Sequence, residues 1–135
     1  MSTYLWILAD DRPFVIGVDE NNRTIFSVNV RARTQGDAAD WMMEIIQHLN
    51  DSGVACVFGV DTFVGPAADI PSGEGPYIQI NDTGGFEPTE AQGGENYDNL
   101  AAQVTVRATD YDLADAKIRA IWKALDGTRN TTVTV

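Results

Sequence analysis

The side chains of this chain that could carry acid–base or nucleophilic chemistry are one histidine, one cysteine and twenty carboxylates. Histidine catalysis would depend on His48 alone, and a triad would need a serine or cysteine held beside it. The sequence contains no G-x-S-x-G, no H-E-x-x-H and no Walker-type phosphate loop. We interpret His48 as a surface residue near the C-terminal end of a helix, where the helix dipole favours a cation. These residue types predict that the protein is not an enzyme.

Cys56 is the only cysteine, so the chain cannot form an intrachain disulfide. It lies within the apolar run from Val54 to Phe58, and apolar surroundings keep a thiol protonated and unreactive. We therefore expect a buried, inert thiol rather than a nucleophile.

Metal binding would have to use the carboxylates. The acidic turn at residues 19–22 lacks the glycine and the distal glutamate of a calcium loop. Glu87, Glu90, Glu95 and Asp98 share one stretch and could gather a hard cation if that stretch folded back on itself. A solvated or inter-subunit stretch explains them better, so we predict no metal and no cofactor. A small metal- or ligand-binding domain stays open as an alternative.

The elements that must position these residues begin with strands. Tyr4 to Leu8 and Phe14 to Val18 are short apolar runs, and residues 19–22 have turn chemistry because Asp and Asn tolerate positive φ. From Thr24 to Arg33, apolar and polar side chains alternate with the period of a strand that buries one face. The sequence predicts a β-hairpin region over residues 1–33.

Two amphipathic helices are predicted, over residues 34–52 and 109–126. Each begins with a capping pattern and is followed by glycine, at Gly53 and Gly127. In each, apolar residues recur at spacings of three and four and form one stripe. The stripes are Ala38, Trp41, Met42, Ile45, Ile46 and Leu49, and Tyr111, Ala114, Ile118, Ile121, Trp122 and Leu125. The polar side of the first helix is Asp40, Glu44, Gln47 and His48.

The remaining strands are predicted over residues 54–58, 77–81, 100–108 and 131–135, and two segments between them look irregular. Gly59 to Gly75 and Thr83 to Asn99 hold several prolines and glycines. Loops of this length in a small domain are usually functional arms or disordered. We interpret Gly84 and Gly85 as a hinge for the second arm, because no helix N-terminus follows them that could bind phosphate.

Length and charge limit the classes of function. At 135 residues the chain suits a single domain, over residues 1–135, that can bury a sizeable core. The formal net charge of -11 repels phosphate backbones, so DNA binding without regard to sequence is not expected. The acidic surface serves solubility, or it forms a wall that passing DNA does not bind. We see no signal peptide and no membrane span.

Several segments, in this order, carry a family resemblance. Residues 65–70 precede the strand at 77–80, which runs into Asp82-Thr83-Gly84-Gly85. Residues 104–108 then lead through Tyr111 to a helix that ends in Leu125-Asp126-Gly127. The combination resembles the tail terminator proteins of long-tailed bacteriophages, often labelled minor capsid proteins. The resemblance covers roughly residues 37–135.

Residues 1–33 resemble the hairpin that members of this family usually carry at the C-terminal end. Here that hairpin comes first, which suggests a circular permutation. A permuted chain would leave Val135 and the N-terminal strand as neighbours in the sheet. Residues 1 and 135 on opposite sides of the domain would contradict the hypothesis.

The resemblance implies an α+β fold, with a mixed, mainly antiparallel sheet, two helices packed on one face and long loop arms. It also implies a virion structural protein of the tail or neck, present in the host cytoplasm during assembly. Family members form a ring, usually of six, that caps the head-proximal end of the tail tube and joins it to neck proteins. Another neck or tail-completion ring protein is the nearest alternative.

The partners that the resemblance implies are other copies of the chain, the major tail tube protein and a neck or head-completion protein. DNA would pass through the lumen without specific binding, and no membrane is involved. We expect the two irregular segments to make the contacts, with aromatic anchors at Phe63, Phe86 and Tyr97. Packing of each aromatic side chain onto its own domain is the alternative. The predicted interface residues are Phe63, Asp82, Thr83, Gly84, Gly85, Phe86, Glu87, Glu90, Tyr97 and Arg129.

Overall fold

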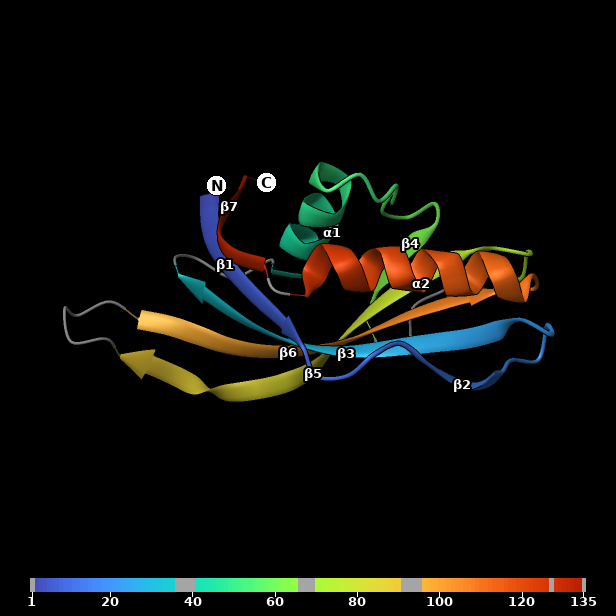
Figure 1. The fold of residues 1–135 in the computed structure, drawn as a ribbon, viewed down its shortest axis with the longest axis horizontal. Coiled ribbons are helices and arrows are strands. Elements are labelled where there is room, and N and C mark those ends of the chain that lie inside the picture. The colour runs from blue at the N-terminus through green and yellow to red at the C-terminus, as the bar shows by residue number, and fades with distance from the viewer. Residues whose placement is uncertain (1, 36–40, 66–69, 91–95, 127, 135) are drawn as a thin grey trace.

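The strands form one mixed sheet in the computed structural model, which describes residues 2–35, 41–65, 70–90, 96–126 and 128–134 (Figure 1). The order is β4-β5-β6-β3-β1-β7, and β2 also pairs with β3. Only β4 and β5 pair in parallel among these strands. The strands are β1 (Ser2–Ala9), β2 (Phe14–Val18), β3 (Thr24–Gln35), β4 (Thr62–Val64), β5 (Tyr77–Glu90), β6 (Asn96–Ala108) and β7 (Thr128–Thr134). The predicted mixed, mainly antiparallel sheet is confirmed.

Both helices, α1 (Trp41–Asp51) and α2 (Tyr111–Leu125), lie on the same side of the sheet (Figure 1). The alternation from Thr24 onward brings every second side chain of β3 to this side, and β5 and β6 do the same. Burying each Ile or Val contributes about 1.5–3 kcal/mol, so this layer holds the fold together. The core residues that are fully buried include Val28, Ile45, Leu49, Ile78, Ile80, Val104, Val106, Ile118, Ile121 and Leu125.

The second helix begins after a capping residue whose side chain accepts hydrogen bonds from the backbone of the first turn. Asp110 is the N-cap, and its carboxylate accepts hydrogen bonds from the N–H groups of Asp112 and Leu113. Tyr111, placed in the apolar stripe by its spacing, is exposed, although its ring packs edge-to-face on Phe26 with 5.1 Å between centroids. The other stripe positions of α2 are buried or half-buried, as predicted.

The start and the polar side of the first helix differ from the prediction. Thr34 and Gln35 continue β3, because β1 on one side and β6 on the other pair with their backbone. This strand pairing outweighs the local capping pattern. The residues that follow, 36–40, lie outside the described residues. Glu44 and His48 are buried rather than exposed, since α2 and β7 both lie against α1. His48 Nε2 lies 3.0 Å from the carbonyl oxygen of Ala124.

The strand predicted at residues 54–58 does not form. The Asn50 side chain takes the hydrogen bonds of this backbone instead: its amide donates to the Cys56 carbonyl, and its oxygen accepts from the Cys56 N–H. The first strand after α1 is the short β4. Cys56 is buried as predicted, its thiol donates to the Ile46 carbonyl, and burial raises its pKa.

The two ends of the described chain lie side by side (Figure 1). Strand β1 pairs antiparallel with β7, so that Ser2 faces Thr134. Strand β7 starts at Thr128, three residues before the predicted start. This pairing satisfies the condition that a circular permutation requires, and the permuted order itself stays a prediction. Among the described residues, neither helix is long and apolar enough to cross a membrane.

Candidate functional site

The second predicted arm, residues 83–99, is largely a β-hairpin rather than an irregular loop. Strands β5 and β6 pair antiparallel from Tyr77 opposite Arg107 to Glu90 opposite Asn96. Their distal halves extend past α1 and α2, at the left of Figure 1. Residues 91–95 lie outside the described residues. We keep the name arm for residues 83–99.

Two β-bulges lie in the arm, both on β5. The register shifts by one residue between Asp82 and Gly84, and again between Phe86 and Thr89. A bulge leaves one residue unpaired and bends the strand, and the second one contains Pro88, which has no N–H to donate. The Asp82 to Gly85 signature therefore marks the point where the arm changes direction. The hinge predicted at Gly84 and Gly85 is therefore a bend within a paired strand.

The predicted interface residues lie on four different strands. Asp82 and Thr83 are exposed on β5, at the first bulge. Phe63, on β4, is half-buried, and its ring lies 6.3 Å from that of Tyr77, so it packs on its own domain away from the arm. The backbone of Gly84, Gly85, Phe86, Glu87 and Glu90 belongs to β5, that of Tyr97 to β6 and that of Arg129 to β7. The side chains of these last residues lie outside the described part of the structure.

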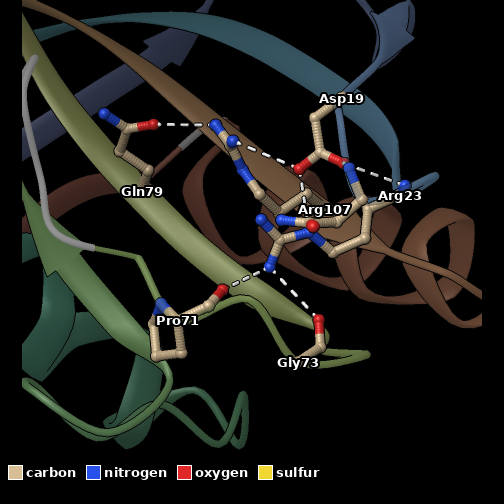
Figure 2. Close-up of polar contacts among 7 residues, drawn as sticks. Asp19, Arg23, Pro71, Gly73, Gln79 and Arg107 are labelled. Carbon is tan, nitrogen blue, oxygen red and sulfur yellow. Dashed lines mark hydrogen bonds and ion pairs between the residues drawn. The ribbon is translucent and has the colours of Figure 1, made fainter.

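At the end of β5 and β6 opposite to the arm, four polar side chains form a connected group that we call the turn network: Asp19, Arg23, Gln79 and Arg107 (Figure 2). The Arg23 Nε donates to Asp19 Oδ2 at 2.8 Å, and Arg107 Nη1 lies 3.6 Å from the same oxygen. Arg107 Nη2 also donates to Gln79 Oε1 at 3.1 Å. Arg107 belongs to β6 and Gln79 to β5, so the network joins both strands of the hairpin to the β2–β3 turn.

Arg23 also holds the segment before β5. It is only 3% exposed, and its Nη1 donates to the carbonyl oxygens of Pro71 and Gly73 (Figure 2). The guanidinium carbon lies 5.6 Å from the centre of the Tyr77 ring, a cation–π distance. Gly75 is required beside them, because its φ is 81° and a Cβ there would lie 2.5 Å from the Arg107 carbonyl oxygen.

The first predicted arm, residues 59–75, is therefore fastened to its own domain at several points. Its middle forms β4, which pairs with β5. Gly65 donates its N–H to the Ile80 carbonyl and accepts from the Gln79 amide, and Thr109 N–H donates to the Glu74 carbonyl. Residues 66–69 lie outside the described residues. Apart from β4, the described part of this segment is irregular, as predicted, but it contacts β5 and Arg23 of its own domain.

The turn network changes the pKa values of two of its charged groups. Burial alone would raise the pKa of Asp19, but hydrogen bonds from the backbone and side chain of Arg23 and from Asn21, with the Arg23 charge, lower it. Burial lowers the pKa of Arg107, which Asp19 partly offsets. The turn at Asp19 was predicted from the sequence, whereas the part played by Arg23 and Arg107 was not. The sequence feature that could have indicated this ion pair is the spacing of Asp19 and Arg23, which lie four residues apart across a turn.

Replacing Asp19 with Asn should lower the free energy of unfolding by about 1–3 kcal/mol at pH 7, because buried charge-assisted hydrogen bonds are lost. The folded-state pKa of Asp19 is lowered, so its contribution is complete above the unfolded pKa of about 3.9 and disappears as pH falls through the folded value. Urea unfolding at pH 7 and at pH 2–3 should therefore show the wild-type advantage shrinking in acid.

A matched control is Asp115→Asn, because Asp115 forms an exposed ion pair with Arg119 at 3.0 Å. That substitution should change stability by under about 1 kcal/mol at either pH. An advantage of Asp19 over Asn that stayed the same from pH 7 to pH 2 would contradict a role for its charge.

Within the described part of the chain, the groups considered for catalysis or metal binding are not brought together. Among the described residues, no three His, Cys, Asp or Glu side chains gather as metal ligands would. Buried His48 contacts α2, and Cys56 contacts the backbone of α1. The side chains of Glu87, Glu90 and Asp98, and all of Glu95, lie outside the described part.

Comparison with known proteins gave one match. A family model described as bacteriophage tail terminator protein matches residues 52–134, which is more than half of the chain. Within that range lie β4, β5, β6, α2 and β7, and with them the whole arm. Neither the search of curated proteins nor that of solved structures gave a match.

Proposed function

Because the chain belongs to the bacteriophage tail terminator family, it is a structural component of the phage tail, and we propose that it forms a ring capping the head-proximal end of the tail tube. The observation that carries this proposal is the arm. It is a paired, twice-bent hairpin that extends beyond the body. Such an element is built to contact another protein rather than a small substrate.

A ring follows from a contact between unlike surfaces repeated around an axis that closes. One face of this ring would match the last ring of the tail tube and block further addition of tube subunits. The opposite face would receive a neck or head-completion protein. Partners of this ring are thus other copies of the chain, the tube protein and the neck protein.

The charge of the chain suits a ring through which DNA passes. A formal net charge of -11 repels the phosphate backbone and keeps passing DNA from binding. The ring therefore needs no specific contact with DNA.

The proposal can be tested with purified tail tube protein of the phage that encodes the chain. Adding the chain during tube polymerisation should shorten the tubes once about one ring per tube is present, as electron microscopy would measure. Bovine serum albumin at the same mass is the control for crowding. Tubes whose length does not respond to the chain would contradict a capping role.

A further inference from the structure

Two exposed apolar surfaces lie far apart on the sheet. The first is the β2 patch, made of Phe14, Val15, Ile16 and Val18, whose side chains are 39–62% exposed. Strand β2 pairs with β3 along one edge only, so within the described residues its other edge has no strand beside it. An apolar edge strand left open in this way is a site for association with another chain.

The second surface is the apolar turn, residues 57–60, which covers the outer side of β4. Val57, Phe58 and Val60 are 54–65% exposed. The turn is well ordered by its own hydrogen bonds: Asp61 Oδ1 accepts from Val57 N–H at 2.7 Å, and Gly59 N–H donates to the Thr62 carbonyl at 2.8 Å. Its shape is thus fixed while its apolar side chains remain uncovered.

The two surfaces cannot cover each other within one chain. Strands β5, β6 and β3 separate β4 from β2, which is roughly 19 Å at the usual strand spacing. In Figure 1, β2 lies at the lower right, whereas the green segment that joins α1 to β4 passes above α2. Both surfaces are therefore open to partners from outside the chain.

The placement of the two surfaces and their lack of charge suit a second copy as the partner. Copies with a formal net charge of -11 repel one another wherever acidic surfaces meet. The segments 13–18 and 54–60 contain no acidic or basic residue, so they are places where two copies can approach without that repulsion. Each surface lies at its own end of the sheet, and one contact repeated between copies would cover both.

We infer that the apolar turn of one copy packs on the β2 patch of the next copy. This contact joins unlike surfaces, so it propagates around a ring when the rotation closes. The inference rests on the proposed ring and adds to it the pair of surfaces that would hold neighbouring copies together. Both surfaces lie away from the arm, which is left to meet other tail proteins.

Cysteine cross-linking of the full-length protein tests the contact. Val18→Cys and Val60→Cys are made as separate variants, with tags of different size, and mixed before mild oxidation. We expect a disulfide between position 18 of one copy and position 60 of another. The parent protein is the control, since its Cys56 is buried. Cross-links formed only between identical positions, or a monomeric protein without cross-links at high concentration, would overturn the inference.

Charge substitutions give an independent readout in sedimentation experiments. Ile16→Asp and Val60→Asp should each raise the dissociation constant between copies at least about tenfold, because each places a carboxylate in an apolar contact. Leu113→Asp is the matched control, since Leu113 is 53% exposed on α2, outside both surfaces. Thermal melting confirms that each variant is folded. Unchanged assembly of folded Ile16→Asp and Val60→Asp would overturn the inference.

The two experiments can contradict the contact between copies and the capping function separately. Cross-links between positions 18 and 60 in a protein that leaves tube length unchanged would support the contact and contradict the cap. Tubes that are capped by a protein without these cross-links would support the cap and contradict the contact.

Discussion

Removing residues 85–96 is expected to leave a folded protein that no longer joins the tail. Gly84 pairs with Ala101, so the deletion leaves residues 97–100 as a four-residue hairpin loop, a length that hairpins commonly use. Among the residues whose side chains are described, the buried residues of β5 and β6 lie on the body side of this cut. We expect the melting temperature to change little, while complementation of a phage lacking the chain falls roughly 30-fold or more, as loss of a central contact would produce.

A second variant separates the shape of the arm from its charge. Glu87→Gln with Glu90→Gln keeps the length of the hairpin and removes two carboxylates. This variant should complement far better than the deletion if the arm acts through its backbone and shape. Normal complementation by the folded deletion variant would contradict a role for the arm.

Replacing Arg23 with Ala should destabilise the protein by about 3–5 kcal/mol, the range for breaking a buried ion pair by removing one partner. The substitution leaves the Pro71 and Gly73 carbonyls without their donor and leaves Asp19 with Arg107 as its remaining arginine. Arg23→Lys keeps the charge without the planar fork, so an intermediate loss is expected. Urea unfolding measures all three proteins.

The matched control for Arg23 is Arg31→Ala. Arg31 also pairs with an aspartate, Asp10, but its side chain is 55% exposed. Exposed pairs contribute about 0–1 kcal/mol, so this variant should remain close to the wild type. Equal losses for Arg23→Ala and Arg31→Ala would show that burial and the two carbonyl contacts contribute nothing.

The sequence predicted well those elements that bury one face. The alternation from Thr24 to Arg33 and from Leu100 to Ala108 predicted β3 and the inner part of β6, and the stripe from Ile118 to Leu125 predicted α2. In each case a periodic apolar face packs on the core, so pattern and structure have the same cause. The first helix was predicted in its middle and misjudged at its start, where strand pairing extended β3.

The arm could not be predicted in the same way, because its pairing leaves no periodic trace. Residues 83–90 and 96–99 are rich in glycine, proline and polar side chains, which are typical of loops. Their backbone ladder continues from the buried part of β5 and β6, and the two bulges accommodate Thr83 and Pro88. The strand at 54–58 failed for the opposite reason, since an apolar run was present but the Asn50 side chain bonds its backbone.

The turn network joins residues that are far apart in the sequence. Asp19 and Arg23 are close in sequence, but Gln79 and Arg107 reach them only through the pairing of β3 with β6 and β6 with β5. Such a group becomes visible once the register is known. The interface residues named from the sequence lie mostly on the arm, and their part in assembly stays a prediction.

The length of tail tubes in cells infected by a phage that lacks this chain decides whether the chain caps the tube. A cap that stops growth predicts tubes longer than those of the wild type and unjoined to heads, with normal length restored when the chain is supplied from a plasmid. Electron microscopy of lysates measures both properties. Tubes of wild-type length that are joined to heads in the absence of the chain would contradict the account.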